Sequence, residues 1–104
     1  MMDTCGLTPT NREEILGKLR SLKLDLAQRY AISQIGVFGS VSRAEATEAS
    51  DIDIVVHMQP DMLKRACLKA ELERIFGRRV DVVRYWYGMN TYLKNRIDQE
   101  AVYV

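Results

Sequence analysis

Cysteine and proline are scarce in this chain, and no long hydrophobic run interrupts it. Only two cysteines occur among the 104 residues, Cys5 and Cys67, which excludes a disulfide framework as the basis of the fold. The N-terminal residues lack the basic and then apolar pattern of a secretory signal peptide. No apolar run approaches the roughly 20 residues needed to span a bilayer. These absences predict a reduced, cytoplasmic protein.

A charge excess of either sign is also missing. The chain has 15 Lys and Arg residues against 14 Asp and Glu residues, a formal net charge of +1. This balance excludes a polybasic protein that holds nucleic acid by bulk charge alone. Hydrophobic residues make up 47% and charged residues 28%, an ordinary globular composition that excludes a disordered chain. The length predicts one domain over residues 1–104.

Hydrophobic periodicity and capping signals predict alternating helices and strands. Thr10 and Glu13 have capping-box spacing, and Gly77 is typical of the residue that follows a helix. Helices are expected over 10–30, from Ser40 to about Ala46, over 60–76 and over 90–100, and strands over 35–38, 51–57 and 79–85, before a short tail over 102–104.

The element order αβαβαβα predicts an α/β fold, a small mixed β-sheet flanked by helices. The strand over 79–85 is expected at an edge of the sheet, because Arg79 and Arg84 bracket it and charged residues protect sheet edges.

Two carboxylates mark the strand over 51–57. Because side chains alternate along a strand, Asp51 and Asp53 point to one face and lie about 6.6 Å apart at the backbone. Their oxygens can converge on two hard cations about 3.5–4 Å apart, the arrangement used in two-metal phosphoryl chemistry. Without a cation, the two like charges would repel each other. If the strand that holds Asp81 is a neighbour, all three carboxylates meet at one site.

A glycine–serine pair precedes these carboxylates and suits phosphate binding. Gly39 allows the backbone to approach a bound group closely, and Ser40 offers a hydroxyl. The start of the expected helix would present free N–H groups, and Arg43 could bind phosphate oxygens with its fork of donors. Singly, a Gly-Ser pair is usually a turn and an Asp-x-Asp pair a strand end. Their combination favours a phosphoryl-transfer site.

Other polar and aromatic residues have weaker functional signals. His57 shares the face of Asp53 but lies about 13 Å away by strand rise, which favours a structural or solvent-facing histidine. Cys67 aligns with Leu63 and Ala70, which predicts a core position. The aromatic run over 85–87 could stack on a base, although a capping cluster or a partner interface is favoured.

Residues 39–45 (GSVSRAE) followed by 50–56 (SDIDIVV) resemble the signature of the minimal nucleotidyltransferases of the DNA polymerase beta superfamily. The likeness is greatest to the antitoxin half of HEPN–MNT toxin–antitoxin pairs, and it extends to residues 93–104, which resemble the usual ending of that family. Ala44 stands where the family often has glycine.

The resemblance implies a nucleotidyltransferase fold and assigns roles to residues. Asp51 and Asp53 become metal ligands, and Asp81 becomes a third carboxylate, ligand or general base. Gly39 and Ser40 become the phosphate-binding turn, and Arg43, which matches a frequent arginine of the family, a nucleotide-binding residue.

The implied reaction is transfer of AMP from ATP to a hydroxyl with two Mg²⁺ ions, for which Mn²⁺ could substitute. One small domain leaves little chain for a separate acceptor pocket, so a partner protein should supply the acceptor. The resemblance implies that the partner is a HEPN ribonuclease toxin, which is silenced when AMP is attached to one of its tyrosines. Neither a membrane nor a nucleic acid is expected as a direct substrate of this chain. The oligomeric state stays open.

Two alternative functions remain. The first is a small-molecule nucleotidyltransferase of the aminoglycoside-modifying type, although such enzymes usually have an added helical domain. The second is an antitoxin that acts by binding only, against which the three carboxylates argue.

Overall fold

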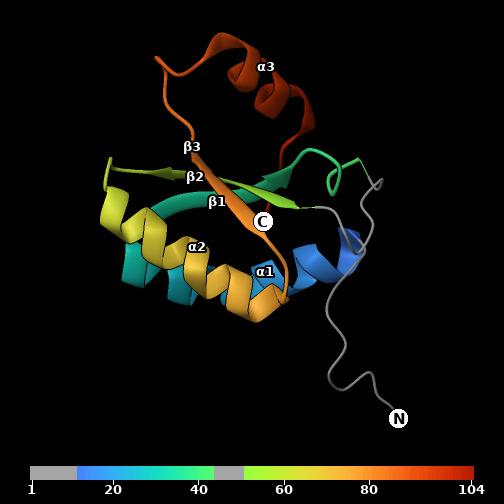
Figure 1. Cartoon of the computed structure of the whole chain (residues 1–104), viewed down its shortest axis with the longest axis vertical. Coiled ribbons are helices and arrows are strands. Elements are labelled where there is room, and N and C mark those ends of the chain that lie inside the picture. The colour runs from blue at the N-terminus through green and yellow to red at the C-terminus, as the bar shows by residue number, and fades with distance from the viewer. Residues whose placement is uncertain (1–11, 44–50) are drawn as a thin grey trace.

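The computed structural model describes residues 12–43 and 51–104, which form three helices and a four-stranded mixed sheet. This arrangement confirms the predicted α/β fold (Figure 1). None of the described helices is both long enough and apolar enough to cross a membrane. The elements in chain order are α1 (Arg12–Tyr30), β1 (Ile32–Phe38), β2 (Ile52–Met58), α2 (Met62–Phe76), β3 (Val80–Arg84), α3 (Thr91–Glu100) and β4 (Val102–Tyr103).

The strands lie in the order β3-β2-β1-β4. β1 is antiparallel to β2 and β4, whereas β2 and β3 are parallel and are joined through α2. β3 is an edge strand, as predicted. The expected tail instead forms β4, which pairs with β1 at Gly36. A Cβ atom at Gly36 would lie 2.5 Å from the carbonyl oxygen of Val102, so the glycine permits this close pairing.

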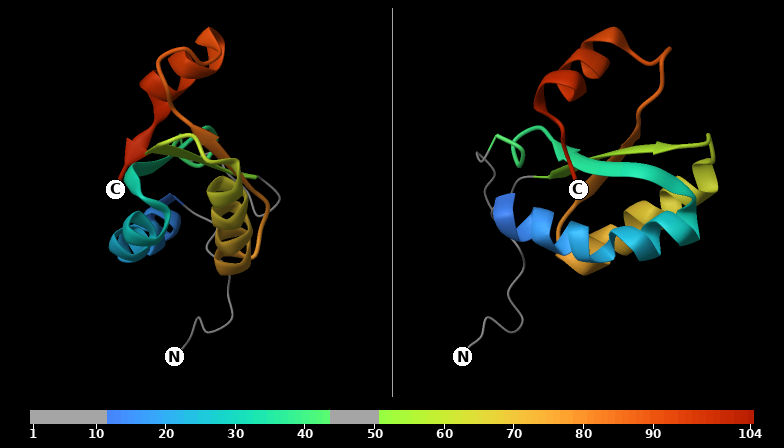
Figure 2. Two further views of the ribbon diagram at one scale, coloured as in Figure 1. Left: turned by 90° about the vertical axis from the view of Figure 1, so that its left-hand side faces the viewer. Right: turned by 180° about the vertical axis from the view of Figure 1, so that it is seen from behind.

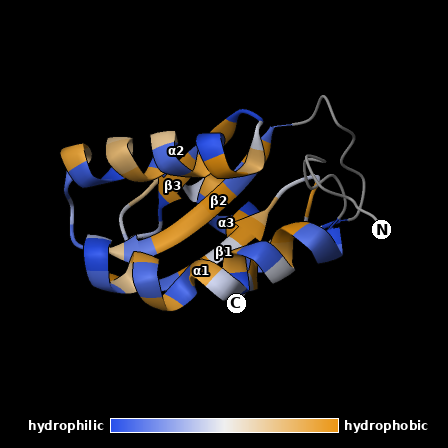
Figure 3. Ribbon diagram, turned by 90° about the horizontal axis from the view of Figure 1, so that it is seen from below, coloured by the Kyte–Doolittle hydropathy of each residue, from blue (hydrophilic) through white to orange (hydrophobic). Residues whose placement is uncertain are grey.

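Helices cover both faces of the sheet. α1 and α2 pack on one face and α3 lies over the other, as the views in Figure 2 show. The larger core cluster joins α1 and α2 to one side of the sheet, and a smaller cluster joins Ile97 of α3 to Phe38 and Val55 on the other. Seen from below, β2 is mainly hydrophobic between the mixed surfaces of α1 and α2 (Figure 3). The sheet is therefore the middle of three layers.

Local capping fixes several helix ends. The side chain of Asp61 accepts a hydrogen bond from the backbone N–H of Lys64 at 2.9 Å, and Gly77 ends α2 with φ 67°. The predicted end of this helix is confirmed. Thr10 lies outside the described residues. Residues 39–43 form turns where a helix was expected after Ser40, and the rest of that segment, 44–50, is outside the described residues.

The prediction that Cys67 belongs to the core is wrong, because its side chain is exposed. α2 instead buries Leu68, Leu72 and Phe76, which recur every four residues along one side of the helix. Cys67 aligns with a second apolar row that includes Leu63, and Leu63 is 66% exposed.

An ion-pair cluster joins α1 to α2. The Arg29 guanidinium donates to both carboxylate oxygens of Glu71, and the Tyr30 hydroxyl donates to Glu71 at 2.7 Å. These bonds, with that of Arg29 foremost, lower the pKa of Glu71 to about 2. The ionised carboxylate is therefore favoured in the folded state, and it stabilises the packing of the two helices.

We expect Glu71→Gln to lower the free energy of unfolding by about 1–2 kcal/mol at pH 7, because a charge-assisted cluster loses its acceptor. The pKa of Glu71 is depressed on folding, so its contribution is complete above the ordinary pKa and is lost as the pH falls towards 2. Urea unfolding at pH 7 and pH 2.5 measures this difference. Glu13→Gln, in an exposed ion pair with Arg12, is the matched control and should cost less than about 1 kcal/mol at either pH. An equal loss for Glu71→Gln at both pH values would contradict the assignment.

Candidate active site

The parallel register of β2 and β3 places two of the predicted carboxylates side by side. Asp53 and Asp81 are direct partners across the two strands. Asp51 comes immediately before β2, two residues from Asp53. On the other side of Asp53 lies Phe38, the last residue of β1. The sequence left this strand pairing as a condition, and the structure meets it, which brings the acidic residues to the end of the sheet where β1 stops.

The electrostatics of Asp53 reflect this crowding. Burial raises the pKa of the half-buried Asp53 carboxyl, and the nearby charges of Asp81 and Asp51 raise it further. Arg96 and Arg43 oppose the shift. A carboxylate that is partly desolvated beside two like charges is stabilised by added positive charge.

Carboxylate oxygens are the donors that a hard divalent cation takes. Within the ranges 12–43 and 51–104, no three His, Cys, Asp or Glu side chains converge closely enough to enclose an ion. The adjacent pair of Asp53 and Asp81 still fits Mg²⁺, which is commonly held by one or two carboxylates, with water and substrate phosphates completing its shell.

The Gly39 turn packs directly against Asp53. Gly39 has φ +76°, and a Cβ atom there would lie 2.4 Å from the Oδ2 atom of Asp53. The backbone of this turn can lie against the carboxylate only because residue 39 has no side chain. The sequence-predicted turn and the carboxylates therefore belong to one site.

Several bonds hold this turn in shape. The Ser42 hydroxyl and the Arg43 N–H both donate to the Gly39 carbonyl, at 2.8 and 3.2 Å. Val41 is fully buried and anchors the turn in the core. Ser40 is half-buried, and its hydroxyl makes no hydrogen bond to any residue of the described ranges. The Ser40 hydroxyl is thus available to a ligand at the turn.

Two residues of α3 complete the site and were not predicted from the sequence. The carboxylate of Glu100 accepts from the backbone N–H of Gly39 at 3.1 Å and pairs with Arg43 at 2.9 Å. Arg96 reaches the same carboxylate at 3.4 Å. The spacing of Arg96 and Glu100 indicates an ion pair along one helix face, but only the packing of α3 over the sheet shows that both reach the Gly39 turn.

His57 lies apart from the carboxylates, in an aromatic cluster. Its Nε2 atom is 2.9 Å from the Tyr103 hydroxyl oxygen, and its ring stacks on Tyr85 with 4.8 Å between the centroids. Burial lowers the pKa of His57. These contacts agree with the structural role expected for this histidine.

Comparison with known proteins places this geometry in a family. The family model described as "Nucleotidyltransferase domain" matches residues 19–104. The chain is a nucleotidyltransferase. The resemblance to this family and the enzyme class that it implied are therefore confirmed.

Similar nucleotidyltransferases are known from sequence and structure. A relative from Thermococcus cleftensis, named protein adenylyltransferase MntA, is 42% identical over 98 residues that cover 88% of this chain and 94% of its own. A solved structure described as a minimal nucleotidyltransferase has a TM-score of 0.72 and 34% identity, covering 88% of this chain and 94% of its own. A structure of the toxin–antitoxin MntA-HpeT has a TM-score of 0.65 and 25% identity, covering 82% and 70%.

We expect Gly39→Ala to destabilise the protein by about 1–2 kcal/mol, because an L side chain is strained at positive φ and its Cβ would collide with Asp53. Thermal unfolding measures the loss. Gly17→Ala is the matched control, since nothing lies within 4 Å of a Cβ at that position of α1. Alanine there should stabilise the helix by about 0.5–1 kcal/mol. A Gly39→Ala protein as stable as the parent would contradict the close packing of the turn on Asp53.

Proposed function

We propose that this nucleotidyltransferase transfers AMP from ATP to a tyrosine of a partner HEPN ribonuclease toxin in the cytoplasm, and so acts as its antitoxin. The observation that carries the proposal is the pairing of Asp53 with Asp81 beside the glycine turn. The protein adenylyltransferase name of the 42% identical relative supports the reaction. The MntA-HpeT structure, a toxin–antitoxin, supports the kind of partner.

The turn residues would bind and orient the triphosphate. The backbone of Gly39 lies against the carboxylate of Asp53, Ser40 follows it in the same turn with a hydroxyl, and Arg43 adds a guanidinium. Backbone N–H groups, a hydroxyl and an arginine are the donors that phosphate oxygens take. Holding the phosphates there places the α-phosphorus near the carboxylates, where an acceptor can attack in line.

The acceptor oxygen would attack the α-phosphorus of ATP. A new oxygen–phosphorus bond forms, the bond to the β-phosphate oxygen breaks, and pyrophosphate leaves. The proton of the acceptor hydroxyl goes to the carboxylate of Asp81, which is exposed and can reach an incoming protein. Asp51, Asp53 and Asp81 would hold two Mg²⁺ or Mn²⁺ ions, which when bound neutralise phosphate charge and lower the pKa of the acceptor hydroxyl.

We expect Asp53→Asn to reduce AMP transfer to the purified partner toxin by about a hundredfold or more, since several kcal/mol of charge stabilisation depend on the carboxylates. The mass increase on the toxin, measured with ATP and Mg²⁺ by mass spectrometry, reports the transfer. Asp25→Asn, the same change at an exposed position of α1, should transfer normally.

The outcomes of this experiment separate the candidate functions. Full transfer by Asp53→Asn, or full transfer in excess chelator, would contradict the role of the carboxylates. Protection of cells from the toxin by Asp53→Asn, without any mass increase, would identify an antitoxin that acts by binding only. Modification of a small hydroxylated compound but of no protein would identify a small-molecule enzyme.

We expect Ser40→Ala to weaken nucleotide binding by about tenfold to a hundredfold, because one hydrogen bond to a charged oxygen is lost. Titration with a fluorescent ATP analogue measures the dissociation constant. Ser21→Ala is the control, since the Ser21 hydroxyl donates to the Lys18 carbonyl on the exposed surface of α1. Equal affinity in both variants would show that Ser40 does not touch the phosphates.

A further inference from the structure

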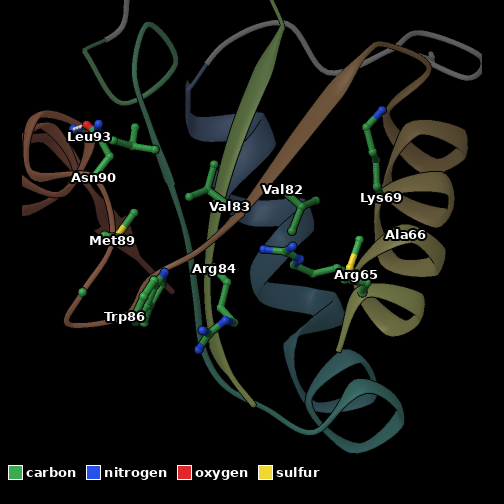
Figure 4. A pocket seen from close by; sticks show the side chains of 12 residues that line it. Arg65, Ala66, Lys69, Val82, Val83, Arg84, Trp86, Met89, Asn90 and Leu93 are labelled. Carbon is green, nitrogen blue, oxygen red and sulfur yellow. Dashed lines mark hydrogen bonds between the residues drawn. The ribbon is translucent and has the colours of Figure 1, made fainter. Parts of the chain in front are cut away.

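A groove of about 540 Å³ follows the open edge of the sheet. Its walls are α2 on one side and residues 86–93 on the other, and β3 forms its floor (Figure 4). Val82 points towards α2 and Val83 towards the opposite side, so the groove covers the edge of the strand rather than one face of the sheet. The function proposed above uses no part of this groove.

The floor of the groove offers unpaired backbone groups. The carbonyl of Arg79 accepts from Ile52 of β2, and the N–H of Tyr85 donates to Val56 of β2. Because these groups alternate along a strand, the N–H and C=O groups of Val82 and Arg84 point away from β2 and into the groove. No strand lies beyond β3 in the described sheet. The edge can therefore accept one more strand.

The two walls differ in chemistry. Arg65 and Lys69 line the α2 wall, and Arg84 lies between the walls with its guanidinium 5.4 Å from the centre of the Trp86 ring. Lys69 is paired with Glu73, whereas the Arg65 guanidinium has no ion pair or hydrogen bond within residues 12–43 and 51–104. The opposite wall is mostly apolar and includes Met89 and Leu93. No acidic side chain is among the described residues that line the groove.

We infer that this groove binds an extended acidic segment of the acceptor protein, added as a strand to the edge of β3. Alternate side chains of such a strand would face opposite walls, so acidic residues meet Arg65 and Lys69 while apolar residues meet Met89 and Leu93. The inference rests on the proposed function for the nature of the partner. The basic side chains of the groove complement the acidic residues of the segment, and the open edge of β3 offers its N–H and C=O groups for hydrogen bonds to the backbone of the segment.

The position of Asp81 links this groove to the reaction. Asp81 precedes Val82 in the same strand, about 3.3 Å away along β3. An acceptor segment that follows the edge therefore leads from the groove directly to the paired carboxylates. Binding along β3 would present a hydroxyl of that segment to Asp81, and the groove would thereby contribute to acceptor specificity.

Trp86 allows binding to be measured without any transfer reaction. It is the only tryptophan of the chain, it lines the groove, and it is 48% exposed. The probe is a synthetic eight-residue peptide in which glutamate alternates with valine or leucine. We expect this peptide to shift the Trp86 emission saturably, and a peptide with lysine in place of glutamate to leave the emission unchanged.

Arg65→Glu should weaken binding of the acidic peptide about tenfold or more, since a charge pair becomes a repulsion. Lys64→Glu is the matched control, because it makes the same charge change on α2 outside the groove and should bind like the parent. Arg65→Glu should also slow AMP transfer to the partner toxin while its affinity for an ATP analogue stays unchanged. Unchanged transfer by Arg65→Glu would overturn the proposal.

Other results of the titration would also overturn this proposal. Equal response to both peptides, or equal affinity of Arg65→Glu and the parent, would show that the groove does not select acidic segments. A shift of Trp86 emission by the ATP analogue, with displacement of the peptide, would identify a nucleotide site instead.

Peptide binding as expected without AMP transfer to any protein would leave the groove assignment standing and contradict the proposed function.

Discussion

Parallel pairing of β2 with β3 holds Asp53 opposite Asp81, and burial on both faces of the sheet fixes the register of that pairing. Ile52, Ile54 and Val56 face the layer of α1 and α2, whereas Val55 faces α3. A slip of one residue in β3 would turn Val80 out of its core and turn Asp81 into it. Each buried valine contributes about 1.5–3 kcal/mol relative to an exposed one, so the core opposes this slip strongly. The hydrophobic core thereby determines the spacing of the acidic residues.

The position of α3 brings a positive charge close to the carboxylates that this register places together. Burial raises the pKa of Asp53 and its two neighbouring carboxylates raise it further, whereas Arg96 of α3 and Arg43 of the Gly39 turn oppose the shift. Ile97, one residue after Arg96, is buried against Phe38 and Val55. Packing of Ile97, with Leu93 beside it in the same cluster, therefore holds the helix and its arginine beside the carboxylates.

Much of this architecture could be predicted from sequence because the signals were local. Asp61 and Gly77 mark the ends of α2 through capping preferences that depend on the neighbouring backbone alone. Strand geometry alone predicts that the side chains of Asp51 and Asp53 share one face. Asp81 joins them only if its strand neighbours theirs, a condition that the sequence does not decide. The structure meets that condition through direct pairing of Asp53 with Asp81.

The sequence could not predict features that depend on how elements pack. α2 has two apolar rows, and only contact with α1 and the sheet decides that Leu68 is buried while Cys67 is exposed. In the sequence, nothing distinguishes Glu100 from an acidic residue on an exposed helix surface, because its contact with the Gly39 turn depends on the packing of α3 over the sheet. A two-residue strand has no periodicity to detect, so the sequence predicts only a tail at residues 102–104.

The contact of Glu100 with the Gly39 turn means that one anion already occupies two donors of that turn, the Gly39 N–H and the Arg43 guanidinium. A backbone N–H has one hydrogen to give, and the N–H of Gly39 gives it to the Glu100 carboxylate at 3.1 Å. Under the proposed role of this turn, a phosphate oxygen that binds this N–H would first have to displace the carboxylate, so the affinity for phosphate would be set by an exchange between two anions. Glu100 also immediately precedes the residues that lead into β4. The exchange would therefore change how the end of α3 is anchored, and the forms with and without phosphate would differ at the C-terminus of the chain as well as at the turn.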